Sequence, residues 1–157
     1  MKTFAAAIRL VIPDNTAGTA LATLNRLGFS LSTLERADVW EFDCPDTLAH
    51  DDFLQRVQHI ETIFNLNKHR IDAVRADGPG PGEVWIRDID EGVPADAADV
   101  LRQFGPDAAG VRHRTAWRLL DSAAPAAPGV VHRAAETLLC NPAFQKASFA
   151  ANANPPG

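Results

Sequence analysis

The feature that most constrains this chain is a set of landmarks that recurs in the same order in its two halves. The run Leu24-Asn25-Arg26-Leu27-Gly28 is matched by Leu101-Arg102-Gln103-Phe104-Gly105, and a tryptophan follows each glycine by 12 residues, at Trp40 and Trp117. The two glycines and the two tryptophans are both 77 residues apart (105 − 28 and 117 − 40). Landmarks at a nearly constant offset indicate a duplicated structural unit.

A later match and a Gly/Pro-rich segment define the domain organisation. Glu61-Thr62-Ile63-Phe64 begins like Glu136-Thr137-Leu138-Leu139, at an offset of 75 residues (136 − 61). The segment 76–82 alternates glycine and proline, which excludes regular structure and predicts a linker. We therefore expect one repeat over 1–75, a linker over 76–82, a second repeat over 83–150 and a disordered tail over 151–157.

Apolar periodicity and turn residues predict the same elements in each half: a strand, a helix, one or two strands, a second helix and a last strand. Gly28 and Gly105 are expected to end the first helix of each half, and Asn15 or Thr16 to cap the first one. Ala37-Asp38 is a possible turn or bulge that would divide the middle strand in two. The expected strands cover 4–12, 29–43, 70–74, 83–89, 110–120 and 144–149, and the expected helices cover 17–27, 53–64, 94–104 and 128–139.

This order predicts an α+β fold of two tandem ferredoxin-like βαββαβ units. Such a unit packs both of its helices on one face of an antiparallel sheet. At about 75 residues it folds alone only marginally, so we expect the two copies to pack together as an intrachain pseudo-dimer. Trp40 and Trp117 are either core residues or interface anchors, and the interface is favoured.

Composition narrows the class of protein. The chain has 157 residues, 46% hydrophobic and 22% charged, with a formal net charge of −5. Neither half is basic, so nucleic acid is not the expected partner. No apolar run approaches the roughly 20 residues that span a bilayer, so no membrane association is expected. Two cysteines, Cys44 and Cys140, in unlike positions indicate reduced thiols and a cytoplasmic location.

The segment Glu136-Thr137-Leu138-Leu139-Cys140-Asn141-Pro142 resembles the "Glu-x-Leu-Leu-x-Asn-Pro" signature of PurS, the small subunit of phosphoribosylformylglycinamidine synthase. Leu24-x-x-Leu27-Gly28-Phe29 is similar to the end of that family's first helix. The chain departs from the family at the turn before each first helix and at the turn between the middle strands. The first copy has Leu66-Asn67 where the alignment on the glutamates places Asn-Pro.

The resemblance implies a non-catalytic structural subunit of purine biosynthesis, which bridges the synthetase and glutaminase subunits and associates further with itself. It makes Leu139, Asn141 and Pro142 interface candidates, together with the two tryptophans. Two other classes stay open. One is a small-molecule-sensing module, because ferredoxin-like pairs often bind amino acids at their shared interface. The other is an enzyme of the dimeric α+β-barrel type, for which only His113 lies on a predicted strand.

No residue constellation predicts chemistry by this chain alone, so we expect no catalytic residues, no metal and no cofactor. Arg112, Arg114 and Arg118 alternate along one predicted strand and are candidates for binding an anion, although a solvated strand face is the simpler interpretation. The histidines at 50, 59 and 69 are spaced by nine and ten residues, unlike metal ligands on a helix. Cys140, near a helix C-terminus, is expected to be structural rather than nucleophilic.

Overall fold

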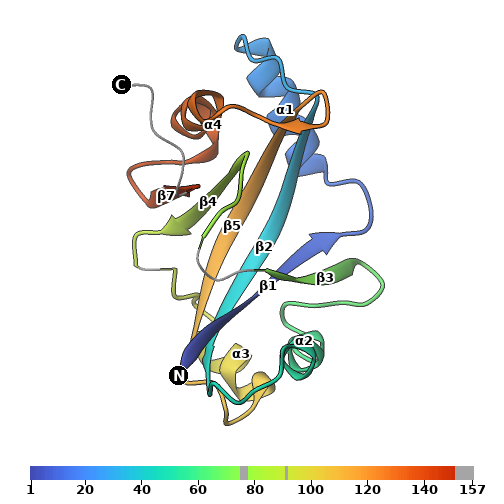
Figure 1. Cartoon of the computed structure of the whole chain (residues 1–157), viewed down its shortest axis with the longest axis vertical. Coiled ribbons are helices and arrows are strands. Elements are labelled where there is room, and N and C mark those ends of the chain that lie inside the picture. The colour runs from blue at the N-terminus through green and yellow to red at the C-terminus, as the bar shows by residue number, and fades with distance from the viewer. Residues whose placement is uncertain (75–77, 91, 151–157) are drawn as a thin grey trace. The chain divides into compact units, whose positions relative to one another are not determined.

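The computed structural model describes residues 1–74, 78–90 and 92–150. It shows a mixed α+β fold with a seven-stranded antiparallel sheet and four α-helices (Figure 1). The strand order is β3-β1-β2-β5-β4-β7, and β6 pairs with β5. In chain order the elements are β1 (Lys2–Leu10), α1 (Asn15–Arg26), β2 (Thr33–Cys44), α2 (His50–Gln58), β3 (His69–Val74), β4 (Glu83–Asp88), α3 (Ala97–Phe104), β5 (Gly110–Asp121), β6 (Ala124–Pro125), α4 (Pro128–Ala134), the π-helical turn η1 (Ala135–Leu139) and β7 (Gln145–Phe149).

The strands of the two halves pair in equivalent registers. Ala6 on β1 lies opposite Trp40 on β2 and opposite Ala73 on β3. In the second half, Val84 on β4 lies opposite Trp117 on β5 and opposite Phe149 on β7. The strands β2 and β5 each have 12 residues, and both their first and last residues are 77 positions apart (110 − 33 and 121 − 44). The repeated landmarks of the sequence therefore coincide with repeated strand positions.

The middle strand of the first half is unbroken, so a turn at Ala37-Asp38 is wrong. Asp38 lies within β2 and pairs with Ile8 on β1, and Ala37 is buried. The second half differs because β5 ends in a two-residue turn, Ser122-Ala123, with φ angles of 51° and 66°. Positive φ at both central residues is the geometry of a tight hairpin, and it brings β6 back against β5. Only the second half thus has the element order βαββαβ.

The chain forms two compact units, and each takes segments from both halves. Unit 1 comprises Met1–Ile12, Ala37–Asp77 and Asp90–Arg114. Unit 2 comprises Pro13–Arg36, Gly78–Ile89 and Thr115–Gly157. The long strands β2 and β5 contribute residues to both units. The division of the chain into repeats at the Gly/Pro segment stays a prediction, and the linker residues 76–77 and the tail 151–157 lie outside the described residues.

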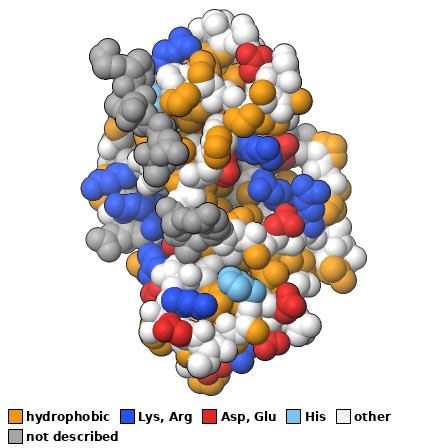
Figure 2. Space-filling view, in the orientation of Figure 1, with side chains coloured by type: hydrophobic (Ala, Val, Ile, Leu, Met, Phe, Trp, Pro, Cys, Tyr) orange, Lys and Arg blue, Asp and Glu red, His pale blue; other side chains and the backbone are white. Residues whose placement is uncertain are grey.

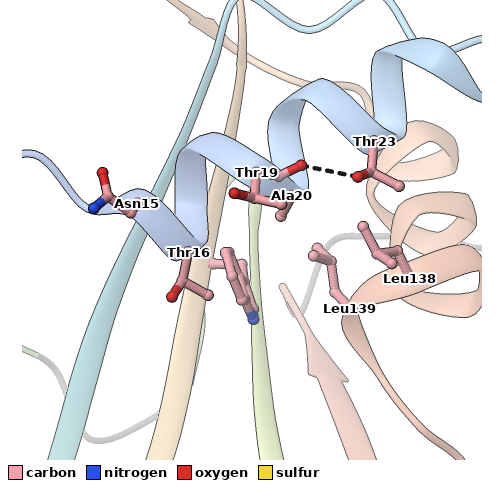
Figure 3. Close-up of a pocket in the computed structure, with 8 residues that line it drawn as sticks. Asn15, Thr16, Thr19, Ala20, Thr23, Leu138 and Leu139 are labelled. Carbon is pink, nitrogen blue, oxygen red and sulfur yellow. Dashed lines mark hydrogen bonds between the residues drawn. The ribbon is translucent and has the colours of Figure 1, made fainter.

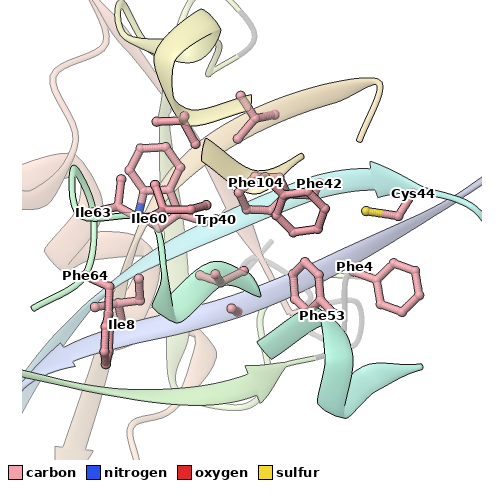
Figure 4. Packing of buried hydrophobic residues seen from close by; sticks show 14 residues of the cluster. Phe4, Ile8, Trp40, Phe42, Cys44, Phe53, Ile60, Ile63, Phe64 and Phe104 are labelled. Carbon is pink, nitrogen blue, oxygen red and sulfur yellow. The ribbon is translucent and has the colours of Figure 1, made fainter. Parts of the chain in front are cut away.

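The core of unit 1 combines the first-half sheet with one helix of each half. Phe53 and Val57 of α2 are fully buried against β1 and β2. Phe104 of α3, which belongs to the second half, is 4% exposed and packs into the same cluster. Its ring stacks on that of Phe42 with centroids 4.7 Å apart, and Figure 4 shows the two rings side by side.

The core of unit 2 is built in the same way from the second-half sheet. Val131 and Ala134 of α4 pack on Val84 of β4. The buried face of α1, a first-half helix, contributes Ala17 and Leu24 to this cluster. The strands of each half are therefore covered by the second helix of that half and by the first helix of the other half. This differs from the expectation that both helices of a half pack on its own strands.

Strand length explains this exchange of helices. Ile8 pairs with Asp38, so the first residues of β2 extend past β1 and lie instead beside β5, where the Ser32 amide donates to the Leu120 carbonyl. Since α1 joins the end of β1 to the start of β2, it is carried to the second-half sheet. At the other end of β2 the Ala109 amide, which precedes β5, donates to the Asp43 carbonyl.

The helix ends partly follow the sequence expectations. Gly28 and Gly105 both have positive φ, 102° and 119°, as expected for glycines that end a helix. Pro128 begins α4, as expected of a proline in a first turn. The cap of α1 is Asp14 rather than Asn15 or Thr16: its carboxylate accepts a hydrogen bond from the Ala17 amide at 3.1 Å.

We expect Phe104→Ala to lower the free energy of unfolding by about 3–5 kcal/mol, because it removes a buried ring from the unit 1 core. Leu27→Ala is the control, since Leu27 is 59% exposed and such positions change stability by less than about 0.5 kcal/mol. Chemical denaturation of both variants measures the difference. Equal stability of the two would contradict the packing of α3 described here.

Candidate functional site

A pocket of about 490 Å³ lies in unit 2 between α1 and η1. One wall is the face of α1 that carries Thr16, Thr19 and Thr23, and Leu138 and Leu139 form the opposite wall (Figure 3). Asn15, Ala20 and Trp117 complete the lining. All of these side chains are uncharged, and the pocket is open to the surface.

Helical spacing explains the threonine wall. Thr16, Thr19 and Thr23 are three and four residues apart and therefore share one face of α1. The Thr23 hydroxyl donates to the Thr19 carbonyl at 2.9 Å, the dashed bond in Figure 3, so this group is satisfied within its own helix. The face that borders the pocket thus presents methyl groups and hydroxyl oxygens rather than the large apolar side chains that would fill it.

The opposite wall is a π-helical turn. The Cys140 amide donates to the carbonyl of Ala135, five residues earlier, at 3.0 Å. One-turn π-helices are uncommon and frequently occur at functional sites. Leu139 is 8% exposed and packs into the unit 2 core, whereas Leu138 is 40% exposed. The turn therefore directs one leucine inward and leaves the next partly open to solvent.

The corresponding elements of unit 1 are joined by hydrogen bonds. The Thr62 hydroxyl donates to Asp99 of α3 at 2.9 Å, and the Gln103 side chain donates to the Thr62 hydroxyl at 2.7 Å. The Glu61 amide also donates to Gln103 at 2.9 Å. Thr62 lies three residues before Asn65, as Leu138 lies three residues before Asn141. Because Leu138 has no hydrogen-bonding group, it forms no such link to the threonine face of α1.

The asparagines of the two repeats play the same structural role. The Asn141 side chain accepts from the Ala143 amide at 3.0 Å, and its carbonyl accepts from the amides of Phe144 and Gln145. Asn65 repeats these contacts: its side chain accepts from the Asn67 amide at 2.9 Å, and its carbonyl accepts from the two residues that follow Asn67. Asn65 therefore makes the same turn as Asn141, one position earlier than the alignment on the glutamates placed it. Its chemistry is that of a turn.

Exposed apolar side chains cluster after η1. Phe144 is 68% exposed, and its carbonyl accepts from the amide of Ile89, which is 49% exposed. Pro142 is also exposed. Pro142 and Phe144 precede β7, an edge strand of the sheet, and Leu138 lies in η1 before them. Charged side chains of both signs are intermixed on the face of the molecule shown in Figure 2.

The interface candidates of the sequence lie in different settings. Trp40 and Trp117 are both 8% exposed, Trp40 in the core of unit 1 and Trp117 in the core of unit 2, where it also lines the pocket. Leu139 lines the same pocket, and Asn141 and Pro142 follow it in the chain. The threonines of α1 and Phe144 were not anticipated, although the three-and-four spacing of the threonines was visible in the sequence.

The candidate anion-binding arginines of β5 all have carboxylate partners on β2. Arg112 makes two bonds to Asp43, at 2.8 and 2.9 Å. The Arg114 guanidinium lies 3.3 Å from Glu41, and that of Arg118 lies 3.8 Å from Glu35. Hydrogen bonding to Arg112 lowers the pKa of the Asp43 carboxyl, with a smaller effect of the same sign from Thr3, against the opposing effect of burial.

The other titratable candidates, His113 and the two cysteines, lie at separate places in the described part of the chain. His113 lies on β5 with its Nε2 atom 2.9 Å from Asp38, and its ring packs on Trp40 in unit 1. Burial raises the pKa of the Cys44 thiol to about 11 and also raises that of Cys140. Among the described residues there is no group of three or more His, Cys, Asp or Glu side chains that could hold a metal ion.

Comparisons with known proteins add no assignment. No protein-family model matches the chain, and no curated protein matches it. Within the described ranges, no helix has the length and apolar content needed to cross a bilayer. The described residues thus show an α+β fold with a seven-stranded antiparallel sheet.

The Asp43–Arg112 pair predicts a contribution to the pH dependence of stability. The folded pKa of Asp43 is below its unfolded value near 3.8, so the pair stabilises the protein above that pH and the contribution is lost as the pH falls through the folded pKa. We expect Asp43→Asn to cost about 1 kcal/mol near neutrality and progressively less in acid. Urea denaturation from about pH 6 to about pH 2 measures this.

Asp72→Asn is the matched control, because Asp72 is 58% exposed and lies 4.0 Å from Arg9. We expect that change to cost less than about 0.5 kcal/mol at neutral pH. A stability difference between Asp43→Asn and the unsubstituted protein that stays constant across the acid range would contradict the linkage.

Proposed function

We propose that the chain is a non-catalytic assembly subunit that resembles the PurS component of phosphoribosylformylglycinamidine synthase and bridges its synthetase and glutaminase subunits in the cytoplasm. The observation that carries the proposal is the setting of the segment 136–144, which resembles the family signature. This segment forms one wall of the pocket and presents Leu138 and Phe144 to solvent. A surface of this kind suits the docking of another protein.

The proposal includes an architecture of two ferredoxin-like repeats that form an intrachain pseudo-dimer. The equal strand registers around Trp40 and Trp117 support it, as do the matching turns at Asn65 and Asn141. In this proposal the repeats have exchanged their first helices. A single chain then does the work of two associated subunits, and the fusion removes the entropic cost of bringing them together.

The test is co-purification with the synthetase subunit, followed by glutamine-dependent synthase activity with and without this chain. We expect the double variant Leu138→Asp/Phe144→Asp to weaken the association by about 30-fold or more, because a charge would be placed in the centre of the docking surface. Leu66→Asp is the control: Leu66 is 78% exposed and occupies the corresponding turn of the first copy. An active synthase assembled in the native host without this chain, using a separate small subunit, would refute the assignment.

A small-molecule-sensing module is the second candidate, and the pocket favours it. Hydroxyl groups of α1 face apolar side chains of η1 across a volume that suits a small ligand. Trp117 lines this pocket, so its fluorescence reports binding. Titration with free amino acids is expected to change that fluorescence if the pocket is a sensor, and Leu138→Asp to abolish the change. A flat titration with every amino acid would exclude amino-acid sensing.

A further inference from the structure

We infer that the charged side chains of β2 and β5 direct these strands to pair with each other within one chain rather than with the same strands of a second copy. The inference concerns assembly and does not depend on the proposed function. It rests on the arrangement of ion pairs along the two strands.

The charges of β2 and β5 are separated by sign. β2 carries four carboxylates and one arginine, Arg36, which binds Asp14 at the start of α1. β5 carries three arginines and one histidine, with a single carboxylate at its last residue, Asp121. Four cross-strand pairs join the acids of β2 to the bases of β5: Asp43–Arg112, Asp38–His113, Glu41–Arg114 and Glu35–Arg118.

Two of these ion pairs have a geometry and a degree of burial at which they contribute to the stability of the strand pair. Arg112 binds both oxygens of Asp43, with side chains 26% and 30% exposed. Arg114 and Glu41 are only 16% and 9% exposed. Bidentate and partly desolvated pairs contribute more than solvated ones, and removing one partner leaves the other charge buried. Glu35 and Arg118, at 41% and 45%, add a weaker contact of the same polarity.

Corresponding positions of β2 and β5 show how these charges affect the choice of pairing partner. Glu35 and Arg112 are 77 residues apart, as are Glu41 and Arg118, which is the offset of Trp40 and Trp117. These two pairs of equivalent positions therefore carry opposite charges. Backbone hydrogen bonding alone does not distinguish β2–β5 pairing from β2–β2 or β5–β5 pairing, because the strands of a duplicated unit have the same shape. The side-chain charges do distinguish them.

Pairing with a second copy would bring like charges together. With partners taken at the 77-residue offset, a β2–β2 pair would place Glu35 beside Asp43 and Glu41, and a β5–β5 pair would place Arg118 beside Arg112 and Arg114. Arg36, which would meet Asp38, is held by Asp14. Like charges opposite each other destabilise a strand pair, whereas opposite charges stabilise it. This arrangement of charges thus favours pairing of β2 with β5 of the same chain and disfavours exchange of halves between chains.

The experiment reverses the charges of each strand in the full-length chain. One variant carries Arg112→Glu and Arg118→Glu, and the other carries Glu35→Arg and Asp43→Arg. We expect each alone to melt about 5–10 °C below the unsubstituted protein, since like charges now face each other. Combining all four changes in one chain restores opposite polarity and is expected to recover at least half of the loss.

Mixing the two double variants and refolding them together tests partner choice. The acidic strands of one chain then match the basic strands of the other, so a mixed complex with a raised melting temperature is expected on size-exclusion chromatography with light scattering. Arg26→Glu/Arg70→Glu, two exposed arginines outside this pairing, is the control and is expected to change neither readout. The inference is overturned if the four-fold variant recovers nothing, or if the mixture melts no higher than its components.

Discussion

The structure depends on two long strands, β2 and β5, that continue without an internal turn. β2 and β5 each run for 12 residues, so each extends beyond the short partner strand of its own half. The extended portion of each long strand pairs with the part of the other long strand that is bound to its short partner. The connecting helices are carried along: α1 packs on the second-half strands and α3 on the first-half strands. A turn in the middle of either strand would allow each half to fold its own two helices onto its own sheet. Their continuity makes each core depend on both halves.

A difference between corresponding parts of the two halves accounts for the pocket of unit 2. In unit 1 the end of the second helix and the neighbouring α3 are joined by the bonds of Thr62 to Asp99 and Gln103. In unit 2 the position of Thr62 is held by Leu138, and the helix opposite presents threonines, so the two elements border an open volume. The two elements are thus joined by hydrogen bonds in unit 1 and separated by a pocket in unit 2. The asparagine turn, by contrast, occurs at both Asn65 and Asn141, where it leads into β3 and β7.

The sequence predicted what depends on local chemistry. The order of elements in the second half, the glycines at 28 and 105 and the helix start at Pro128 follow from periodicity and backbone preferences, and all are confirmed. The first half has one middle strand in place of the two that a βαββαβ unit requires. The continuity of β2 at Ala37-Asp38 was missed, because nothing local distinguishes a paired strand residue from a turn there. The exchange of helices was missed for the same reason: it depends on which strand lies beside β2. Asn65 was missed because the alignment followed Glu61 rather than the turn. The pocket exists because the side chains of α1 do not fill the space beside η1. The residue pattern of one helix does not show which element lies opposite it.

The packing of α3 against the first-half sheet is the most direct test of this account. In nuclear Overhauser spectra with selectively labelled phenylalanine, the ring protons of Phe104 are predicted to show strong cross-peaks to those of Phe42, whose ring centroid lies 4.7 Å away. Phe53, at 6.0 Å, should give weaker ones. Cross-peaks from Phe104 to Val84 and Trp117 of its own half, in place of these, would show that each half folds on itself and would contradict the exchange.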